Sequence, residues 1–184
     1  MDVLEAIKKR QTVRAYKTLP IDDKILNTIL DAGRLAPSRA NSQTARFIVV
    51  KDKNIIAQLL ENAVPPGNRA ANSFKQAPVV IAACAELNNA GFRDGKPSTD
   101  KGGYWYMFDA GLAMENMVLT ATSLGLGTVF VGRMDSKKAE SILEVPPGFT
   151  CVILMVLGYP DEQPVRRPRK ELSEIVFQNK FVIN

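Results

Sequence analysis

The sequence predicts one domain that combines α-helices with buried β-strands. Residues 107–124 contain no proline, are rich in Ala, Leu and Met, and carry apolar side chains on every side, which is typical of a buried helix. Residues 79–85 and 151–157 are continuous apolar runs, which favour strands buried on both faces. The chain of 184 residues has no repeat or low-complexity linker, so we expect no internal domain boundary.

The N-terminal region predicts a short amphipathic helix over residues 2–9, followed by an extended segment. Alternate side chains of an extended segment point the same way, so Arg10, Thr12 and Arg14 would share a face. Two guanidinium groups beside a hydroxyl suit a phosphate, which Arg can hold through parallel hydrogen bonds. An ordinary solvent-exposed basic segment would explain the same three residues.

The next elements are expected in the order helix, loop, strand, helix. The second helix opens at residues 20–22, has apolar residues at core spacing and ends before Pro37. The polar loop 37–43 leads into a strand at 47–50, and Asn54 is positioned to cap a third helix. Pro and Gly in residues 65–68 then break the chain before the apolar run.

Residues 86–103 are polar and rich in Gly, so they are either disordered or a functional lid. The long helix stops at Gly125, and residues 128–131 form a short strand. Asp135 or Ser136 caps a helix over 139–143. A short helix starts at Glu171, and the apolar tail 181–183 docks on its own domain or on a second subunit.

The composition excludes several classes of function. There is no histidine, which excludes Ser-His and Cys-His nucleophilic catalysis and argues against a metal site of the common zinc types. The net charge of +5 is modest and no basic stripe with stacking aromatics occurs, so we expect no nucleic-acid partner. The long helix is too short and too polar at its centre to cross a membrane. The two Cys lie in apolar runs and the N-terminus lacks a signal-peptide core, so a cytoplasmic protein is expected.

Four sequence blocks in order resemble the nitroreductase family of flavin mononucleotide (FMN) enzymes. The blocks are KKRQTVRAY, APSRANSQ, DAGLAMENMVLTATSLGLGTVFVG followed by LGYP, and RRPRKELSEIV, and they span residues 8 to 176. The resemblance implies an α+β fold with a three-layer mixed β-sheet flanked by helices. It also implies an interlocked homodimer with two FMN sites at the subunit interface, with the long apolar helix buried across that interface.

The same resemblance implies which residues contact FMN. The positions that match the family motifs are Arg10, Gln11, Thr12 and Arg14 at the start of the site, Pro37, Ser38, Arg39 and Asn41 in the loop given by the other subunit, Thr128, Val129 and Phe130 along the isoalloxazine, and Arg167 and Arg169 on the phosphate. Two places depart from the family pattern. Gln11 and Thr12 stand where Arg and Ser are usual, and Thr44-Ala45 replace a usual Pro-Trp.

The implied activity is an oxidoreductase in which FMN carries the redox chemistry. NADH or NADPH would pass hydride to flavin N5, and an electron-poor small molecule such as a nitroaromatic, quinone, flavin or enone would then use the same place. Because donor and acceptor would occupy the same site one after the other, ping-pong kinetics are expected. The alternatives are a flavin-binding or storage module without turnover, a related flavoenzyme such as a dehalogenase or a flavin-degrading enzyme, and a binding protein without flavin.

Overall fold

A four-stranded antiparallel sheet forms the centre of the part of the chain that the computed structural model describes, residues 1–181. Its strands lie in the order β1 (Ala45–Val50), β2 (Val79–Glu86), β6 (Phe149–Gly158) and β5 (Gly127–Val131). The two central strands contain the apolar runs predicted as buried strands, and both are confirmed. Residues 182 and 183 of the predicted apolar tail lie outside the described residues.

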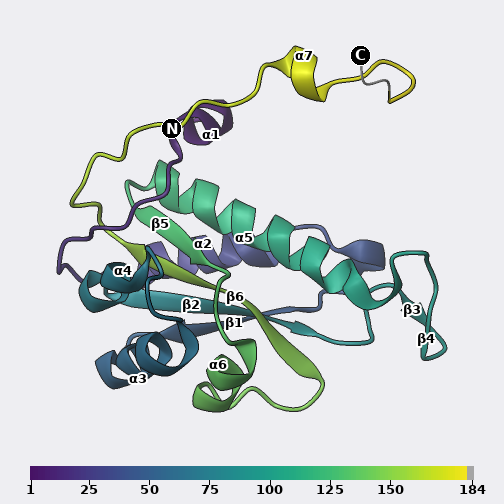
Figure 1. The fold of residues 1–184 in the computed structure, drawn as a ribbon, viewed down its shortest axis with the longest axis horizontal. Coiled ribbons are helices and arrows are strands. Elements are labelled where there is room, and N and C mark those ends of the chain that lie inside the picture. Colours follow the sequence, from purple (N-terminus) through teal and green to yellow (C-terminus); the bar gives the residue numbers. More distant parts are fainter. Residues whose placement is uncertain (182–184) are drawn as a thin grey trace.

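Helices α2 (Asp23–Arg34) and α5 (Trp105–Ser123) cover one face of the sheet (Figure 1). Asp22 caps α2 by accepting a hydrogen bond from the amide of Lys24 at 2.7 Å. Helix α5 is the long apolar helix that the sequence predicts, and Gly125 beyond its end has the left-handed φ of 80°. The core on this face joins side chains of both helices to the sheet, among them Leu26, Ile29, Val79, Ile81, Met114, Met117, Val118, Met155 and Leu157.

The opposite face is covered by short helical segments: α3 (Lys53–Gln58), the π-helical turn Leu59–Ala63, α4 (Ala71–Gln76) and α6 (Ser136–Ile142). A second core lies beneath them, formed with the alternate side chains of the same strands, such as Val80, Ala82, Leu154 and Val156. The sheet is therefore the middle of three layers, which confirms the predicted three-layer α+β arrangement. It is antiparallel between its named strands, and the described parallel pairing is an isolated bridge between Thr12 and Thr128.

Two helix starts test the capping predictions. Helix α6 is capped by Asp135, one of the two predicted residues, which accepts from the amide of Lys138 at 3.1 Å. The prediction that Asn54 caps α3 is wrong, because Asp52 accepts from the amides of Asn54 and Ile55 and the helix already includes Lys53. Helix α4 was not expected, because six residues are too few to show helical periodicity.

The glycine-rich segment 86–103 folds as a small hairpin of β3 (Phe92–Arg93) and β4 (Lys96–Pro97), followed by the 3₁₀ turn Gly102–Tyr104. The indole of Trp105 donates to the hydroxyl of Thr99 at 2.7 Å and ties the hairpin to the start of α5. Of the two expectations for this segment, the structure therefore shows an ordered element and not a disordered one.

The two ends of the chain leave the three layers. Helix α1 (Val3–Lys9) exposes Val3, Leu4 and Ile7, although these residues form its apolar face. Residues 163–181 are exposed apart from a partly buried Pro164, include the short α7 (Leu172–Ile175), and run outward in Figure 1. Among the described residues, no helix has both the length and the apolar character needed to cross a membrane.

Candidate functional site

The N-terminal extended segment lies against β5, an edge strand of the sheet. Thr12 bridges Thr128, and the amide of Val13 donates to the carbonyl of Thr128 at 3.0 Å. Val13 is buried and fits beside Gly127, where a Cβ would lie 2.7 Å from the Cβ of Val13. A glycine at this position therefore allows the segment to approach the strand.

The side chains around Val13 face different surroundings. Arg10, Gln11 and Thr12 are half-buried, and Arg14 is exposed. The side-chain oxygen of Gln11 is buried and has no hydrogen-bond partner among the described residues. An unpaired buried acceptor is costly unless a donor reaches it, so this position suits a ligand that presents an N–H group.

Strand β5 has one exposed side chain. Thr128 and Val129 are buried, whereas Phe130 is 40% exposed. The structure therefore brings seven of the predicted residues together. This group, called group A, comprises Arg10, Gln11, Thr12, Arg14, Thr128, Val129 and Phe130.

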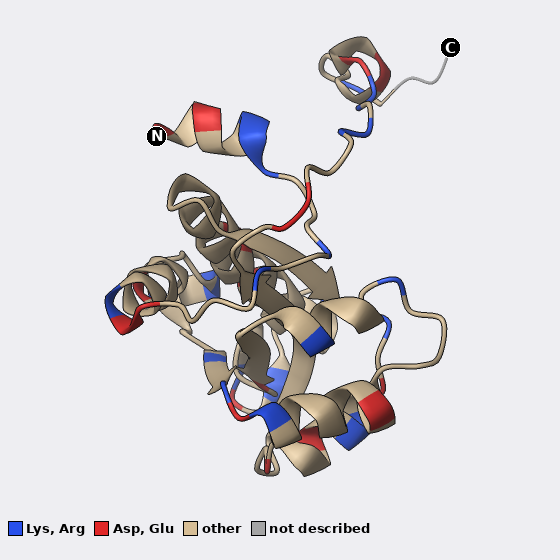
Figure 2. Ribbon diagram, turned by 90° about the vertical axis from the view of Figure 1, so that its left-hand side faces the viewer, with Lys and Arg blue, Asp and Glu red and all other residues tan. Residues whose placement is uncertain are grey.

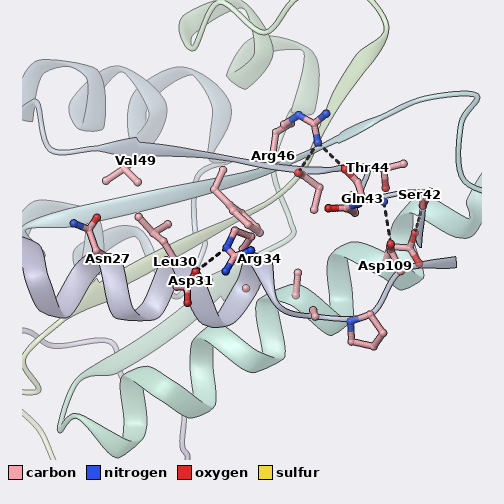
Figure 3. Close-up of a pocket in the computed structure, with 17 residues that line it drawn as sticks. Asn27, Leu30, Asp31, Arg34, Ser42, Gln43, Thr44, Arg46, Val49 and Asp109 are labelled. Carbon is pink, nitrogen blue, oxygen red and sulfur yellow. Dashed lines mark hydrogen bonds and ion pairs between the residues drawn. The ribbon is translucent and has the colours of Figure 1, made fainter. Parts of the chain in front are cut away.

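The predicted loop of Pro37, Ser38, Arg39 and Asn41, called group B, is anchored on the first turns of α5 (Figure 3). The carboxylate of Asp109, only 2% exposed, accepts from the Arg39 amide at 2.9 Å and the Ser42 hydroxyl at 3.1 Å. Asn41 adopts a left-handed φ of 55°, which Asn tolerates better than most residues. The Arg39 guanidinium lies 5.5 Å from the ring centroid of Trp105.

An open groove of about 720 Å³ runs beside group B, between α2, β1 and α5 (Figure 3). Its lining includes the apolar residues Leu30 and Phe47 and the charged residues Arg34 and Arg46. β1 is the outer strand of the sheet on this side, so its free edge borders the groove.

Groups A and B do not meet within one protomer. Group B binds Asp109 at the start of α5, whereas group A lies on β5, which follows the end of α5 at Ser123. The 14 helical steps between Asp109 and Ser123 correspond to about 21 Å at 1.5 Å per residue.

Arg167 and Arg169 join neither group. Both are exposed, and neither side chain makes a hydrogen bond or ion pair with another described residue. Their segment leaves the body where Asp161 donates its amide to the carbonyl of Ala15 at 2.9 Å and Glu162 accepts from the Arg14 amide. Within a single protomer, no hydrogen bond or ion pair among the described residues joins the side chains of these C-terminal arginines to the N-terminal segment.

Tyr16 and Glu162 lie beside the N-terminal segment of group A. Burial raises the pKa of Tyr16 strongly, the negative charge of Glu162 raises it further, and Arg14 acts in the opposite direction. The neutral phenol donates to the carbonyl of Val13 at 2.6 Å and so holds the segment in place. Lys and Arg are spread over several elements (Figure 2), and no group of three metal-ligating side chains occurs in the described part of the chain.

Sequence reasoning missed the anchoring role of Asp109 and the contribution of Ser42. An acidic residue within an otherwise apolar helix was the available signal, because a buried carboxylate needs hydrogen-bond donors. The partner loop, however, lies 67 to 70 residues away along the chain, and no local pattern identifies it.

Known proteins resemble this chain in sequence and in fold. The model of the nitroreductase family matches residues 7–159. A relative from Methanothermobacter thermautotrophicus, named for NADH dehydrogenase and NAD(P)H nitroreductase activities, is 31% identical over 172 residues, which are 91% of this chain and 82% of the relative. An FMN reductase [NAD(P)H] of Bacillus subtilis is 28% identical over 98% of this chain and 75% of its own length.

Among solved structures, a nitroreductase family protein from Clostridium difficile matches with a TM-score of 0.84 and 26% identity, covering 98% of this chain and 100% of that one. The fold and the sequence thus lead to the same assignment: the chain belongs to the nitroreductase family.

Proposed function

We propose that the protein is an FMN-dependent oxidoreductase that passes electrons from NADH or NADPH to an electron-poor small molecule. The observation that carries this proposal is group A, a basic extended segment held against the open edge strand β5 in a chain of the nitroreductase family. Relatives named FMN reductase and NADPH-flavin oxidoreductase support FMN as the cofactor and a reduced nicotinamide as the donor.

The residues of group A fit FMN chemically. The unpaired oxygen of Gln11 can accept from the ring N–H of the isoalloxazine, and the hydroxyl of Thr12 preserves a donor where the family usually has Ser. Arg10 can bind the phosphate, which carries about −1.5 to −2 charges at neutral pH. Thr128, Val129 and Phe130 would flank the ring, and the exposed phenyl of Phe130 offers an apolar surface.

Bound FMN would supply the hydride-accepting N5 atom, and the protein would supply position and charge. The hydrogen bonds of Tyr16 and of the bridge at Thr12 fix the segment before any ligand arrives. Cationic Arg14 and the backbone N–H groups of this region would favour added negative charge nearby, as preorganised donors do in other active sites. No side-chain acid is needed, which agrees with a sequence without histidine.

The complete site would form in an interlocked homodimer. Group B of one protomer would reach group A of its partner, because group B is held at the start of α5 while β5 follows its end, and α5 spans about 21 Å from Asp109 to Ser123. The exposed C-terminal segment would pack on the partner, and the free edge of β1 with its groove offers a place to add backbone hydrogen bonds. Arg167 and Arg169 would then close on the phosphate.

The proposal also covers the cellular compartment and the number of domains. Cys84 and Cys151 are buried free thiols opposite each other on β2 and β6, which suits the reducing cytoplasm. We infer that residues 1–184 form one flavin-binding domain with no metal ion.

The test is the visible spectrum of the purified protein, followed by anaerobic stopped-flow mixing with NADH or NADPH. A yellow protein that bleaches, and recovers its colour with a nitroaromatic or quinone, is expected. Parallel lines in double-reciprocal plots would support the ping-pong scheme. Flavin binding without bleaching would favour a storage module, turnover only with a halogenated aromatic would favour a dehalogenase, and failure to bind added FMN would refute the proposal.

A further inference from the structure

Three arginines, one within group A and two on loops connected to it, have guanidinium groups that make no hydrogen bond or ion pair with another described residue. They are Arg14 in the N-terminal segment, Arg69 before α4, and Arg133 after β5, and all three side chains are exposed. We propose that these residues, called the cationic rim, bind the phosphate groups of the dinucleotide electron donor. The proposal rests on the proposed function and identifies how that site would recognise NADH or NADPH.

Hydrogen bonds place the three segments beside one another. The side-chain amide of Asn68 donates to the carbonyl of Arg133 at 3.0 Å, which joins the loop of Arg69 to the end of β5. The hydroxyl of Ser73 in α4 donates to the carbonyl of Arg14 at 2.9 Å, which joins α4 to the N-terminal segment. The rim therefore lies at the same end of the sheet as Phe130 and Thr12.

The two loops that carry Arg69 and Arg133 are fixed before any ligand binds. The side-chain oxygen of Asn68 also accepts from the Ala70 amide at 2.9 Å. On the other loop, the amide of Asp135 donates to the carbonyl of Ala63 at 2.7 Å. Loops that are already held by hydrogen bonds lose little conformational freedom when a ligand binds, so less of the binding free energy is lost in ordering the charged residues they carry.

The guanidinium groups of the rim are not paired with acids. None of the three guanidinium groups belongs to an ion pair in the part of the chain that the structure describes. The carboxylate of Glu162 accepts from the backbone amides of Arg14 and Ala15, and Asp135 caps α6. Both carboxylates bind backbone amides, and neither pairs with a guanidinium of the rim.

An excess of exposed guanidinium beside a flavin site suits a ligand with several phosphates. The single phosphate of FMN has Arg10 and, in the proposed dimer, Arg167 and Arg169. The donor brings a pyrophosphate, and NADPH adds a 2′-phosphate that an Arg can hold through two parallel hydrogen bonds. The rim is therefore expected to strengthen the binding of both donors and to favour NADPH.

The experiment compares charged and uncharged donors on the FMN-loaded protein. Arg69→Ala, Arg133→Ala and the double variant are mixed with NADH, NADPH and N-benzyl-1,4-dihydronicotinamide, a neutral donor without phosphate, and bleaching is followed by stopped flow. Each single change is expected to raise the dinucleotide concentration for half-maximal bleaching about fivefold, the size expected of an exposed charged contact. Bleaching by the neutral donor should stay the same, and added salt should slow the wild type more than the double variant.

Lys138→Ala removes one exposed positive charge from α6 and serves as the control, with no change expected for any donor. Equal losses with the neutral donor and the dinucleotides, or no loss with either, would overturn the rim while leaving the proposed function standing. A wild-type protein that binds FMN but is bleached by no reduced nicotinamide would overturn both proposals.

Discussion

Glu140 shows how one carboxylate can tie a helix to the sheet. It is 8% exposed and lies in α6, where one oxygen accepts from the Thr150 hydroxyl at 2.8 Å and the Cys151 amide at 2.9 Å. Burial alone would raise the pKa of Glu140, but hydrogen bonds from Lys137 and from these two groups outweigh burial and hold it below the ordinary value of 4.5. The charged form therefore stabilises the fold.

Glu140→Gln is expected to lower the free energy of unfolding at pH 7 by about 1–2 kcal/mol, because hydrogen bonds to a charged group become bonds to a neutral one. A carboxyl whose folded pKa is depressed contributes stability above its unfolded pKa and loses that contribution as the pH falls through the folded value. The difference between variant and wild type should therefore close as the pH drops below 4.5.

Urea unfolding at pH 7 and at several lower values measures this difference. Glu61→Gln is the matched control, since the Glu61 side chain is exposed and has no hydrogen bond or ion pair among the described residues. A gap for Glu140→Gln that persists unchanged at low pH would show that shape, and not charge, is responsible.

Individual site residues could be predicted from the sequence only where a local motif contains them. The basic segment from Arg10 to Arg14 and the strand with Thr128 were recognisable, and the structure shows that they lie together. The contribution of Asn68, whose amide reaches Arg133, was not recognisable, because 65 residues separate these positions. Hydrogen bonds between segments that are far apart in the sequence leave no periodic pattern in it.

At the level of elements, prediction succeeded where burial imposes a pattern. Strands β2 and β6 are covered on both faces, so nearly every residue is apolar and the pattern is unambiguous. Helix α5 is apolar on every side and was recognised for that reason, although Met107 and Phe108 are exposed in the single protomer. Helices α3 and α4 are short and bury one or two residues each, and their caps decide where they begin. Asn54 directly precedes the apolar pair Ile55-Ile56 and so resembles a cap, whereas the actual cap, Asp52, lies three residues before Ile55.

The contact between the N-terminal segment and β5 leads to a prediction for an element. Gly127→Ala would place a Cβ 2.7 Å from the Cβ of Val13, which is closer than carbon atoms approach. The segment must shift, so we expect a loss of about 1–3 kcal/mol in unfolding free energy and weaker FMN binding, since Thr12 moves away from Thr128.

Gly132→Ala provides the stability control, because a Cβ there would meet only Ile153 at an ordinary 3.8 Å. Chemical denaturation and fluorescence titration with FMN measure the two effects. If Gly127→Ala were as stable as Gly132→Ala, the close approach of the segment to β5 would not exist in solution.

At the scale of the whole molecule, the C-terminal segment exposes apolar side chains that pack on nothing within the protomer. Val165 is 91% exposed, Leu172 is 73% exposed, and Phe181 is also open to solvent. Apolar side chains in such numbers usually mark an interaction surface. The sequence showed the composition of this segment, but the surface it contacts belongs to another chain in our proposal, so no pattern within one chain could locate it.

Deleting residues 165–184 is therefore expected to leave the three layers folded, because the described residues of this segment are exposed and contribute nothing to either core. Far-ultraviolet circular dichroism should stay close to that of the full chain. Light scattering should report a monomer, and FMN should no longer be retained. A truncated protein that remained dimeric and yellow would contradict the proposed packing of the C-terminal segment on the partner. Lys180→Ala is the control and should behave as the full chain.

Mixed dimers can decide whether groups A and B meet across protomers. An Arg10→Ala/Arg14→Ala chain and an Arg39→Ala/Asn41→Ala chain, carrying different affinity tags, should each retain little FMN as homodimers, because every site contains a defect. If each site takes group A from one protomer and group B from its partner, the mixed dimer has one intact site and one site with both defects. About half of the wild-type flavin content should then return, measured as absorbance per dimer after two-step affinity purification. Sites built within single protomers would leave both sites of the mixed dimer defective and the protein nearly colourless, and a doubly tagged wild-type dimer sets the value for full occupancy.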